Sequence, residues 1–415
     1  MNLLYYIQTM KRIYFDYAST SPIDKDVLKT ISNTSGAIFG NPSSIHQIGQ
    51  IASKTIFEAK KSIASAIGAK YNEIIFTSGA TEANNLVILG TYNYFIKNNN
   101  KRPHIITTQT EHESILEPLK SIEPYCDITY IPVSKDGLID LNFLTSAIKE
   151  NTILISVIMA NNETGTIAPI KEISKIIKEF SARDGSSLGG KINKSSIYPL
   201  LHTDASQALQ FININVEELG IDLLTLSAHK IYGPKGIGLL YAKNLLPKNN
   251  KTLNSPINPI ILGGGQEFGF RSGTEDVPKI AGFQKSIEIN EKIKKQNYKK
   301  IKELNNYFIK RLKNIHQNLE INGQDLSSNK RIPNIVNIYI PEKDKESLLI
   351  SMDLKGVCAS SGSACASRAN KESGVLKSMG FNEERINQSI RFSFGKFTNK
   401  KEIDESIKII ENITK

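Results

Sequence analysis

Apolar runs that end in polar turns recur along residues 1–240, and stretches with helical spacing separate them. Strands that alternate with helices in this way indicate an α/β protein with a mainly parallel sheet and helical crossovers. The helices that we expect include 45–67, which Ser44 would cap, and a segment that follows the turn at 77–82 and continues through Leu89. The strands that we expect are 73–76, 104–108, 128–133, 152–159 and 239–242.

Two further apolar runs place an acid and an amine at the same point of this sheet. One run leads into Asp204, and the other, at 223–226, leads into Lys230. Because the carboxyl ends of parallel strands meet at one edge, where open α/β sheets bind ligands, we expect the two side chains to lie close together. Such a pair suits pyridoxal phosphate, since a lysine forms a Schiff base with it and a carboxylate keeps its pyridine nitrogen protonated. A buried salt bridge is the structural alternative.

Three other polar turns follow strands of the same sheet. The turn 77–82 joins a strand to a helix, where free backbone N–H groups hold a phosphate, although many such turns only cap the helix. His112 follows the 104–108 strand and would either lie flat on an aromatic cofactor or be an ordinary surface residue. The turn 160–165 follows the next strand and is again polar. All three turns are predicted at the ligand-binding edge.

The second half of the chain continues into a smaller α+β unit. Residues 280–313 predict a long basic helix whose recurring apolar residues face a core. Before it, the Gly- and Ser-rich residues 181–196 predict a flexible surface loop, to which we assign no chemistry. Beyond it, the strands and helices that we expect are 335–340, 346–354, 357–359, 390–394 and 400–413.

Composition narrows the class of protein. The 415 residues are 40% hydrophobic and 22% charged, which is typical of a soluble globular protein. The net charge of +11 is spread through Lys- and Asn-rich segments without an aromatic-interleaved basic stripe, so nucleic acid is not an expected partner. Three cysteines indicate a reducing compartment, and no segment has the pattern of a secretory signal or a membrane span. We expect a cytoplasmic protein, or one of a mitochondrial or mitochondrion-related matrix, translated from Met1 or Met10.

Cys365 is the residue of the second unit that most favours chemistry. It lies in the run ASSGSACAS, which has no large side chain to anchor it in a core. Such a loop can carry a thiol into an active site and out again, whereas a plain Gly/Ser loop with an incidental cysteine is the structural alternative. The chain has no HExxH or CxxC pairing, so we expect no metal site.

Taken together, the motifs resemble the cysteine desulfurases of the NifS/IscS family, which are fold-type I pyridoxal phosphate enzymes of the class-V aminotransferase group. The resemblance implies a large domain at 23–285 with a mainly parallel seven-stranded sheet between helices. It also implies a small α+β domain at 286–415 that carries the Cys365 loop, and an N-terminal segment, 1–22, that packs with the small domain. The motifs occur in family order, as FGNPSS, FTSGATE, TEHES, NNETG, HTDASQA, SAHKIYGPKG, GGGQE, RSGT, SSGSAC and SIRFSFG.

The resemblance also implies roles for individual residues. Lys230 would form the Schiff base and move protons at the substrate Cα, Asp204 would pair with the pyridine nitrogen, and His112 would stack on the ring and act in acid–base steps. The ring oxygen of the cofactor would accept hydrogen bonds from Asn162 and Gln207. The residues for the phosphate would be Ala80, Thr81, Ser227, His229 and, from the other subunit of a homodimer, Thr274. The residues for the substrate carboxylate would be Asn41, Asn334 and Arg391.

The implied reaction takes sulfur from L-cysteine and leaves L-alanine and a persulfide on Cys365. The persulfide would pass its sulfur to an acceptor protein, in iron–sulfur cluster assembly or tRNA thiolation. The chain ends at Lys415 without the C-terminal extension by which IscS-type enzymes engage their scaffold, which leaves the acceptor open. It also departs from the family pattern in the insert 181–196 and in Ala366-Ser367-Arg368, which follows Cys365.

Other functions of the same fold are the alternatives to this one. A selenocysteine lyase and a small-amino-acid aminotransferase are the nearer alternatives, and an aminotransferase would have no use for Cys365 on a Gly/Ser loop. A non-catalytic subunit of sulfur assembly is the more distant alternative. It would be expected to have lost Lys230, Cys365 or Arg391, and all three residues are present.

Overall fold

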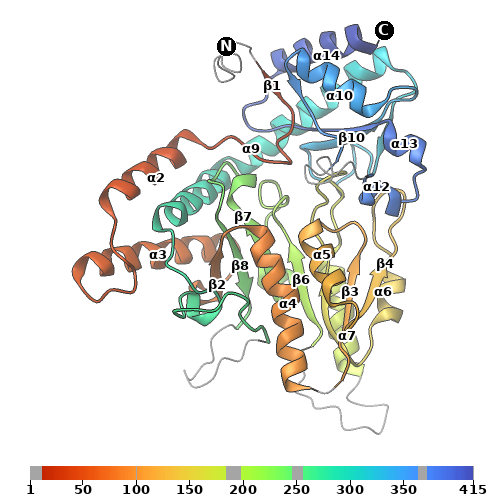
Figure 1. Cartoon of the computed structure of the whole chain (residues 1–415). Helices are drawn as coiled ribbons and strands as arrows, with labels where there is room; N and C mark the ends of the chain where they lie inside the picture. Colours follow the sequence, from red (N-terminus) through yellow and green to blue (C-terminus); the bar gives the residue numbers. More distant parts are fainter. Residues whose placement is uncertain (1–11, 100, 184–197, 245–255, 363–371, 415) are drawn as a thin grey trace.

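The computed structural model describes residues 12–99, 101–183, 198–244, 256–362 and 372–414. They form a larger unit built on a central sheet and a smaller unit at the top of Figure 1, and the long helix α9 (Val277–Ile315) runs from one into the other. In these residues no helix is both long enough and apolar enough to cross a membrane.

A seven-stranded sheet forms the centre of the larger unit. Its strand order is β2-β8-β7-β6-β5-β3-β4, and all neighbours are parallel except β8, which runs antiparallel to β2 and β7. The prediction of a mainly parallel seven-stranded sheet is confirmed. The strands are β2 (Ile74–Thr77), β3 (His104–Thr108), β4 (Asp127–Ile131), β5 (Thr152–Ser156), β6 (Leu200–Asp204), β7 (Leu223–Ser227) and β8 (Gly238–Ala242).

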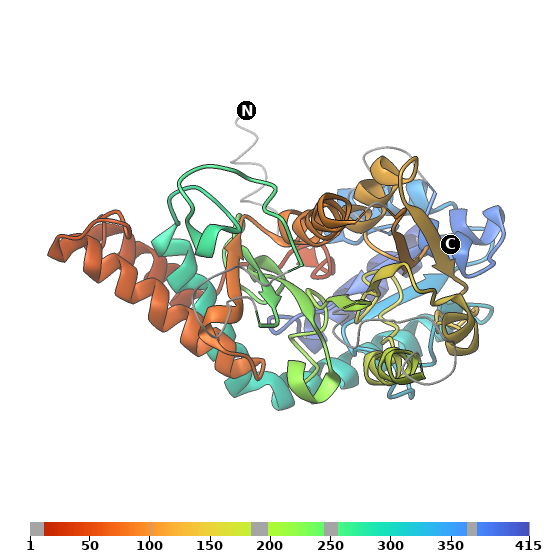
Figure 2. The same cartoon turned by 90° about the horizontal axis from the view of Figure 1, so that it is seen from below.

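Helices cover both faces of this sheet, as the view in Figure 2 shows. On one face, α4 (Ala80–Asn98) and α5 (Glu113–Ile122) share an apolar core with the strands. On the other face, α3 (Gln47–Ala66), α7 (Ile170–Arg183) and α9 share a second, larger core. Burial on both faces explains why the inner strands carry apolar residues at consecutive positions, such as Ile153 and Leu154 in β5, and not only at alternating ones. The remaining helices of this unit are α2 (Lys25–Ala37), α6 (Leu141–Ala147) and α8 (Val216–Leu219).

The smaller unit has an antiparallel sheet of order β12-β10-β9. β1 (Ile13–Tyr14) pairs in parallel with β11 (Val357–Cys358), so the start of the described chain packs in this unit. Its other elements are β9 (Glu320–Asn322), β10 (Ile335–Tyr339), β12 (Ser389–Ser393), α10 (Lys345–Leu354), α12 (Gly374–Ser378), α13 (Glu383–Asn387) and α14 (Lys400–Thr414).

The turn that follows β1 connects the two units. The backbone N–H of Tyr17 donates to the carbonyl of Ser393 in β12, and the backbone N–H of Ser21 donates to the carbonyl of His229 at the edge of the large sheet. An aromatic cluster in which the Phe308 ring of α9 contacts Phe15 holds the beginning of this turn in place. Residues 16–21 therefore lie between the small unit and the ligand-binding edge.

The element bounds mostly agree with the sequence patterns, with two differences. The helix expected to continue through Leu89 extends to Asn98, because its apolar face keeps packing on the sheet. The prediction that Ser44 caps α3 is wrong. The cap is His46, whose Nδ1 accepts from the backbone N–H of Gly49 at 3.2 Å, while the backbone of Ser44 belongs to the preceding turn. The domain bounds 23–285 and 286–415 stay predictions, and α9 runs through the proposed boundary without a break.

Candidate active site

The polar residues predicted from the strand ends gather at one edge of the sheet. β6 ends at Asp204 and β7 ends at Ser227, and a short 3-10 turn, Ala228–Lys230, follows β7 directly. The two strands are parallel neighbours, with Asp204 opposite Thr225. Asp204 is buried and the Lys230 side chain is half-buried. The acid and the amine therefore lie at the same edge, as the sequence predicts.

The Lys230 amine is held by the turn after β1. Its Nζ donates to the carbonyl oxygens of Ala18 at 2.6 Å and Ser19 at 2.8 Å. The Gln207 amide nitrogen donates to the same Ala18 carbonyl at 2.8 Å. Lys230 and Gln207, which come from different connections of the sheet, therefore meet at one backbone oxygen.

The Asp204 carboxylate has a hydrogen-bond donor on each oxygen. Oδ1 accepts from the backbone N–H of Ser206 at 2.9 Å, and Oδ2 accepts from the side-chain amide of Asn84 in α4 at 2.8 Å. Bonds of this kind stabilise the ionised carboxylate against the cost of burial. The arrangement fits an acid that has to stay charged beside a pyridine nitrogen.

His112 is the N-cap of α5, at the same edge. Its Nδ1 accepts from the backbone N–H of Ser114 at 3.1 Å and lies 2.8 Å from the Ser114 hydroxyl. Burial lowers the pKa of His112, and the Lys230 amine acts in the same direction, against an opposite effect of Asp204. The imidazole is therefore neutral near pH 7, which suits a group that stacks on an aromatic ring.

The N-terminus of α4 offers a place for a phosphate. No side chain caps this helix at Gly79, and a Cβ built on Gly79 would meet nothing within 4 Å. Ala80 and Thr81 form the first turn, and Gly238 joins this region to Ser227 because it pairs with Ser227 on β7. A helix N-terminus without a cap has backbone N–H groups directed at an anion.

His229 lies at the same end of the site. Its Nδ1 is 3.1 Å from the hydroxyl of Thr20. Burial lowers the pKa of His229 to about 3, and the neighbouring Lys230 and Lys235 add to this effect. The ring is therefore a neutral hydrogen-bonding group at physiological pH.

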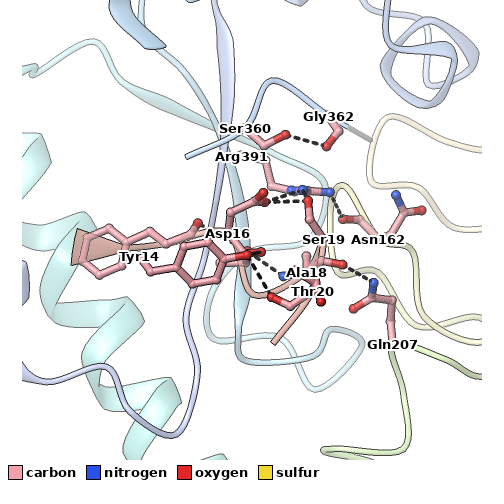
Figure 3. A network of polar contacts seen from close by, with 12 residues as sticks. Tyr14, Asp16, Ala18, Ser19, Thr20, Asn162, Gln207, Ser360, Gly362 and Arg391 are labelled. Atoms are coloured by element: carbon pink, nitrogen blue, oxygen red, sulfur yellow. Dashed lines mark hydrogen bonds and ion pairs between the residues drawn. The ribbon is translucent and has the colours of Figure 1, made fainter. Parts of the chain in front are cut away.

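Arg391 on β12 is almost fully buried and brings the small unit to the same site. One terminal nitrogen donates to the carbonyl of Asn162 at 2.9 Å. The other donates to the Asp16 carboxylate at 2.7 Å and to the Ser19 hydroxyl at 2.8 Å, as Figure 3 shows. The same turn of residues 16–19 therefore contacts both Arg391 and Lys230.

Three buried polar atoms at or beside Arg391 have no partner within the described residues. They are Nε of Arg391 itself, Oδ1 of Asn334, which precedes β10, and Nδ2 of Asn337, which lies opposite Arg391 on β10. Asn334 and Arg391 are near one another because the backbone N–H of Phe394 donates to the Asn334 carbonyl and β12 pairs with β10. Buried polar groups normally have a partner, and Nε of Arg391 is a donor, so it can serve an acceptor such as a ligand carboxylate, whereas Oδ1 of Asn334 requires a donor.

Three predicted residues are not brought into this cluster. Asn41 is exposed on the connection between α2 and α3, which projects from the body of the molecule in Figure 1. Thr274 is also exposed, and it lines a pocket with Thr77 and Ser78, which precede the N-cap of α4. Cys365 lies outside the described residues, between Gly362 and Ser373 along the chain.

Several residues of the site were not found from the sequence. Asn84 and Ser114 each lie in the first turns of a helix and read as ordinary polar helix positions. Asp16 and Ser19 belong to a turn whose partners are more than 200 residues away. The signal for this turn was the short apolar run before Asp16 and the small polar residues Ser19, Thr20 and Ser21 after it.

The assembled groups fit pyridoxal phosphate. An amine, a carboxylate with two donors, a neutral imidazole and an uncapped helix N-terminus lie at one sheet edge, where such folds bind ligands. These are the groups that this cofactor needs for its aldehyde, its ring nitrogen, its ring face and its phosphate.

Known proteins share this sequence and this fold over nearly the whole chain. The family model "Aminotransferase class-V" matches residues 13–405. Cysteine desulfurase IscS of Dictyoglomus turgidum is 41% identical over 406 residues, which are 97% of this chain and 95% of that protein. A protein of Encephalitozoon cuniculi named "Cysteine desulfurase, mitosomal" is 43% identical over 400 residues, which are 95% of this chain and 84% of that protein.

The solved structures agree with these sequence relatives. A structure titled "NIFS-LIKE PROTEIN" aligns with a TM-score of 0.84 and 31% sequence identity, over 97% of this chain and 99% of that one. The resemblance inferred from the motifs is confirmed, and the comparisons do not favour the lyase and aminotransferase alternatives. The chain belongs to the class-V aminotransferase family and, within it, to the NifS/IscS cysteine desulfurases.

Proposed function

We propose that this protein uses pyridoxal phosphate to take sulfur from L-cysteine, giving L-alanine and a persulfide on Cys365. The observation that carries the proposal is the placement of the Lys230 amine and the doubly hydrogen-bonded Asp204 carboxylate at one sheet edge, with the buried Arg391 guanidinium connected to the same turn. An amine and an acid alone would fit many pyridoxal phosphate enzymes. Family membership and Cys365 favour desulfuration among them.

The cofactor, when bound, supplies an aldehyde and a ring that takes up electrons from the substrate Cα. Lys230 would bond to its aldehyde and would move a proton at the substrate Cα. Asp204 would keep the ring nitrogen protonated, His112 would stack on the ring, and Gln207 and Asn162 would donate to the ring oxygen. The first turn of α4, at Ala80 and Thr81, would hold the phosphate together with Ser227 and His229.

Arg391 is the proposed anchor for the substrate carboxylate. A guanidinium binds a carboxylate through two parallel N–H bonds, and the unpartnered Nε of Arg391 leaves a donor for this purpose among the described residues. Asn334 would contribute its buried side chain to the same corner. This contact fixes the direction in which the substrate thiol points.

The sulfur step follows from the chemistry of the two thiols. The Cys365 thiolate attacks the sulfur of the substrate, so that an S–S bond forms while the Cβ–S bond of the substrate breaks. The electron pair of the broken bond stays on the carbon skeleton, which takes up a proton and leaves as L-alanine. No external oxidant or reductant is needed, because the products together contain the atoms of L-cysteine and the Cys365 thiol.

A second copy of the chain is the proposed source of the two residues that the single protomer leaves apart from the site. Asn41 lies between Phe39, which is 77% exposed, and Ile45, which is 92% exposed. An apolar surface of this kind is covered in most stable proteins. We infer a homodimer in which this connection and Thr274 contact the partner's site, and sedimentation of the purified protein at micromolar concentration tests it. A protein that stays monomeric would contradict this part of the proposal.

The proposal also covers the acceptor of the sulfur and the compartment of the protein. We propose a protein acceptor, either a scaffold for iron–sulfur clusters or a relay for tRNA thiolation. The cytoplasm is the proposed compartment, and an organelle matrix is the alternative, since one relative is described as mitosomal. Microscopy of the tagged full-length chain distinguishes the two compartments.

A single-turnover assay tests the reaction. The purified protein is scanned for the absorbance of bound pyridoxal phosphate and then given L-cysteine, after which alanine and Cys365-bound persulfide are quantified. We expect both products from the wild type, persulfide lost in Cys365→Ala, and both products lost in Lys230→Ala. Alanine without persulfide in the wild type, or turnover of another amino acid that is indifferent to Cys365, would refute the proposal.

A further inference from the structure

A buried chain of hydrogen bonds connects Asp204 with His112, to which the proposed function gives the ring nitrogen and the ring face of the cofactor. The Asn84 amide nitrogen lies 2.8 Å from Oδ2 of Asp204 and 2.8 Å from the Ser114 hydroxyl. The Ser114 hydroxyl lies 2.8 Å from Nδ1 of His112. Asn84 is fully buried and Ser114 nearly so, so water does not compete for these bonds.

The direction of each hydrogen bond follows from what its atoms can donate. The Asp204 carboxylate accepts, so Nδ2 of Asn84, which carries two hydrogens, faces it as the donor. The reversed amide would set Oδ1 against the carboxylate, and Oδ1 in fact has no partner among the described residues. The donor side of Asn84 therefore sets its orientation, and its second hydrogen points to the Ser114 oxygen.

This direction determines the state of the imidazole. Because the Ser114 oxygen accepts from Asn84, its own hydrogen is free to be donated to Nδ1 of His112. The backbone N–H of Ser114 points at the same nitrogen from 3.1 Å. Two donors converge on Nδ1, so Nδ1 carries no proton and a neutral His112 carries its proton on Nε2.

We propose that Asn84 and Ser114 are positioning residues that fix His112 as the tautomer with the proton on Nε2 and link it to the Asp204 carboxylate. The proposal deepens the proposed function, on which the role of His112 rests. A His112 held in this state presents an N–H group at Nε2 for proton exchange and keeps Nδ1 occupied. Within the described residues, the charged groups that act on the imidazole are Asp204 from β6, Lys230 from the turn after β7 and Glu113 from its own helix. A pocket beside His112 is also lined by Glu111, Glu163 and Glu372.

The test is the tautomer itself, measured on the purified wild-type protein with ¹⁵N-labelled histidine. Two-bond ¹H–¹⁵N spectra distinguish protonated Nε2 from protonated Nδ1, and a His112→Gln variant identifies the His112 signals among the six histidines. We expect the Nε2–H tautomer between about pH 7 and 8. A wild-type spectrum with the proton on Nδ1, or with both tautomers in similar amounts, would overturn the proposal without any variant having to fold.

Two substitutions separate positioning from a merely structural role. Ser114→Ala removes the relay hydroxyl and leaves only the backbone donor, so the Nδ1–H population is expected to rise by up to about tenfold. Asn84→Asp replaces the donor by an acceptor, which draws the Ser114 hydroxyl away from Nδ1 and has a similar effect. Asn98→Ala, at the other end of α4, is the matched control with an unchanged His112 spectrum, because the Asn98 amide is exposed and donates to the Tyr94 carbonyl.

The outcomes are distinguishable from a failure of the proposed function. If Ser114→Ala and Asn84→Asp unfold more easily but keep the wild-type His112 spectrum, the two residues are structural only and the inference is wrong. If the tautomer moves as expected but L-cysteine gives no alanine with any variant or with the wild type, the positioning stands and the desulfurase proposal fails.

Discussion

Gly238 lies where the proposed phosphate-binding turn touches the sheet, and its replacement by alanine tests that contact. Gly238 begins β8 and pairs with Thr77 on one side and Ser227 on the other. An alanine Cβ would lie 2.7 Å from Cα of Gly79 and 2.7 Å from the Leu226 carbonyl oxygen. Both are backbone atoms, so no change of a side-chain rotamer relieves the contact.

The size of the effect follows from this geometry. Bringing the Cβ from 2.7 Å to an ordinary contact of 3.4 Å requires a backbone shift of about 0.7 Å at the start of α4 or in β8. Overpacking of this kind costs about 1–3 kcal/mol of the free energy of unfolding. A shift of α4 also moves the backbone N–H groups of Ala80 and Thr81 away from the phosphate. We therefore expect Gly238→Ala to weaken binding of pyridoxal phosphate more than binding of pyridoxal, which lacks the phosphate.

Two measurements check this prediction. Urea unfolding followed by circular dichroism gives the change in stability, and absorbance titrations with the two compounds give the change in preference. Gly36→Ala is the matched control, because a Cβ at Gly36 in α2 would meet nothing within 4 Å. Its stability should be unchanged or higher by up to about 1 kcal/mol. If Gly238→Ala keeps the stability and the phosphate preference of the wild type, the contact does not have the role that we give it.

Three further predictions concern the fold and the substrate site. Burial lowers the pKa of His104 to about 4, so the folded ring stays neutral while the unfolded ring takes up a proton below about pH 6.5, and stability is lost as the pH falls from there towards 4. Burial raises the pKa of Glu111 to about 8, and this acts on stability in the opposite direction, so the wild type is compared with His104→Gln. Between pH 7 and 5 the free energy of unfolding should fall by roughly 2 kcal/mol less in His104→Gln than in the wild type. Equal pH slopes of the two proteins would contradict the reasoning. Phe308→Ala should lower the free energy of unfolding by about 3–5 kcal/mol, because its buried ring contacts three other phenylalanines, and a loss under 1 kcal/mol in urea unfolding would show that the cluster repacks. Arg391→Lys should raise the KM for L-cysteine on the order of tenfold or more, since an ammonium replaces a planar fork with three acceptors, and an unchanged KM in the alanine assay would count against the assigned anchor.

The order of strands and helices could be predicted from the sequence because local patterns of apolar and polar residues determine it. The strands that end at Asp204 and before Lys230 each begin with two leucines and are buried on both faces, as strands of a parallel sheet covered by helices are. Parallel neighbours end at one edge, so the meeting of these two residues also followed from the sequence. The family motifs then added roles for His112, Gln207 and Arg391 that residue patterns alone left open.

Local detail was less certain where several residues can do the same task. Ser44 has the residue type of a helix cap, yet His46 caps α3, because the turn that contains Asn41 uses the backbone of Ser44. The roles of Asn84 and Ser114 in the site were not predicted from the sequence for the same reason. An amide or a hydroxyl in the first turns of a helix is common, and nothing local marks the one that reaches a buried carboxylate.

The turn from Asp16 to Ser21 is what only the tertiary structure decided. The sequence determined that Lys230 and Asp204 share a sheet edge, because strand periodicity and chain direction are local properties. It did not determine that the carbonyls of Ala18 and Ser19 hold Lys230, or that Asp16 pairs with Arg391 across 375 positions of the chain. Those contacts exist because β1 pairs with β11 and an aromatic core packs behind it, which brings the turn between the two units. Interactions between distant segments depend on how whole elements pack, and no short stretch of residues encodes that packing.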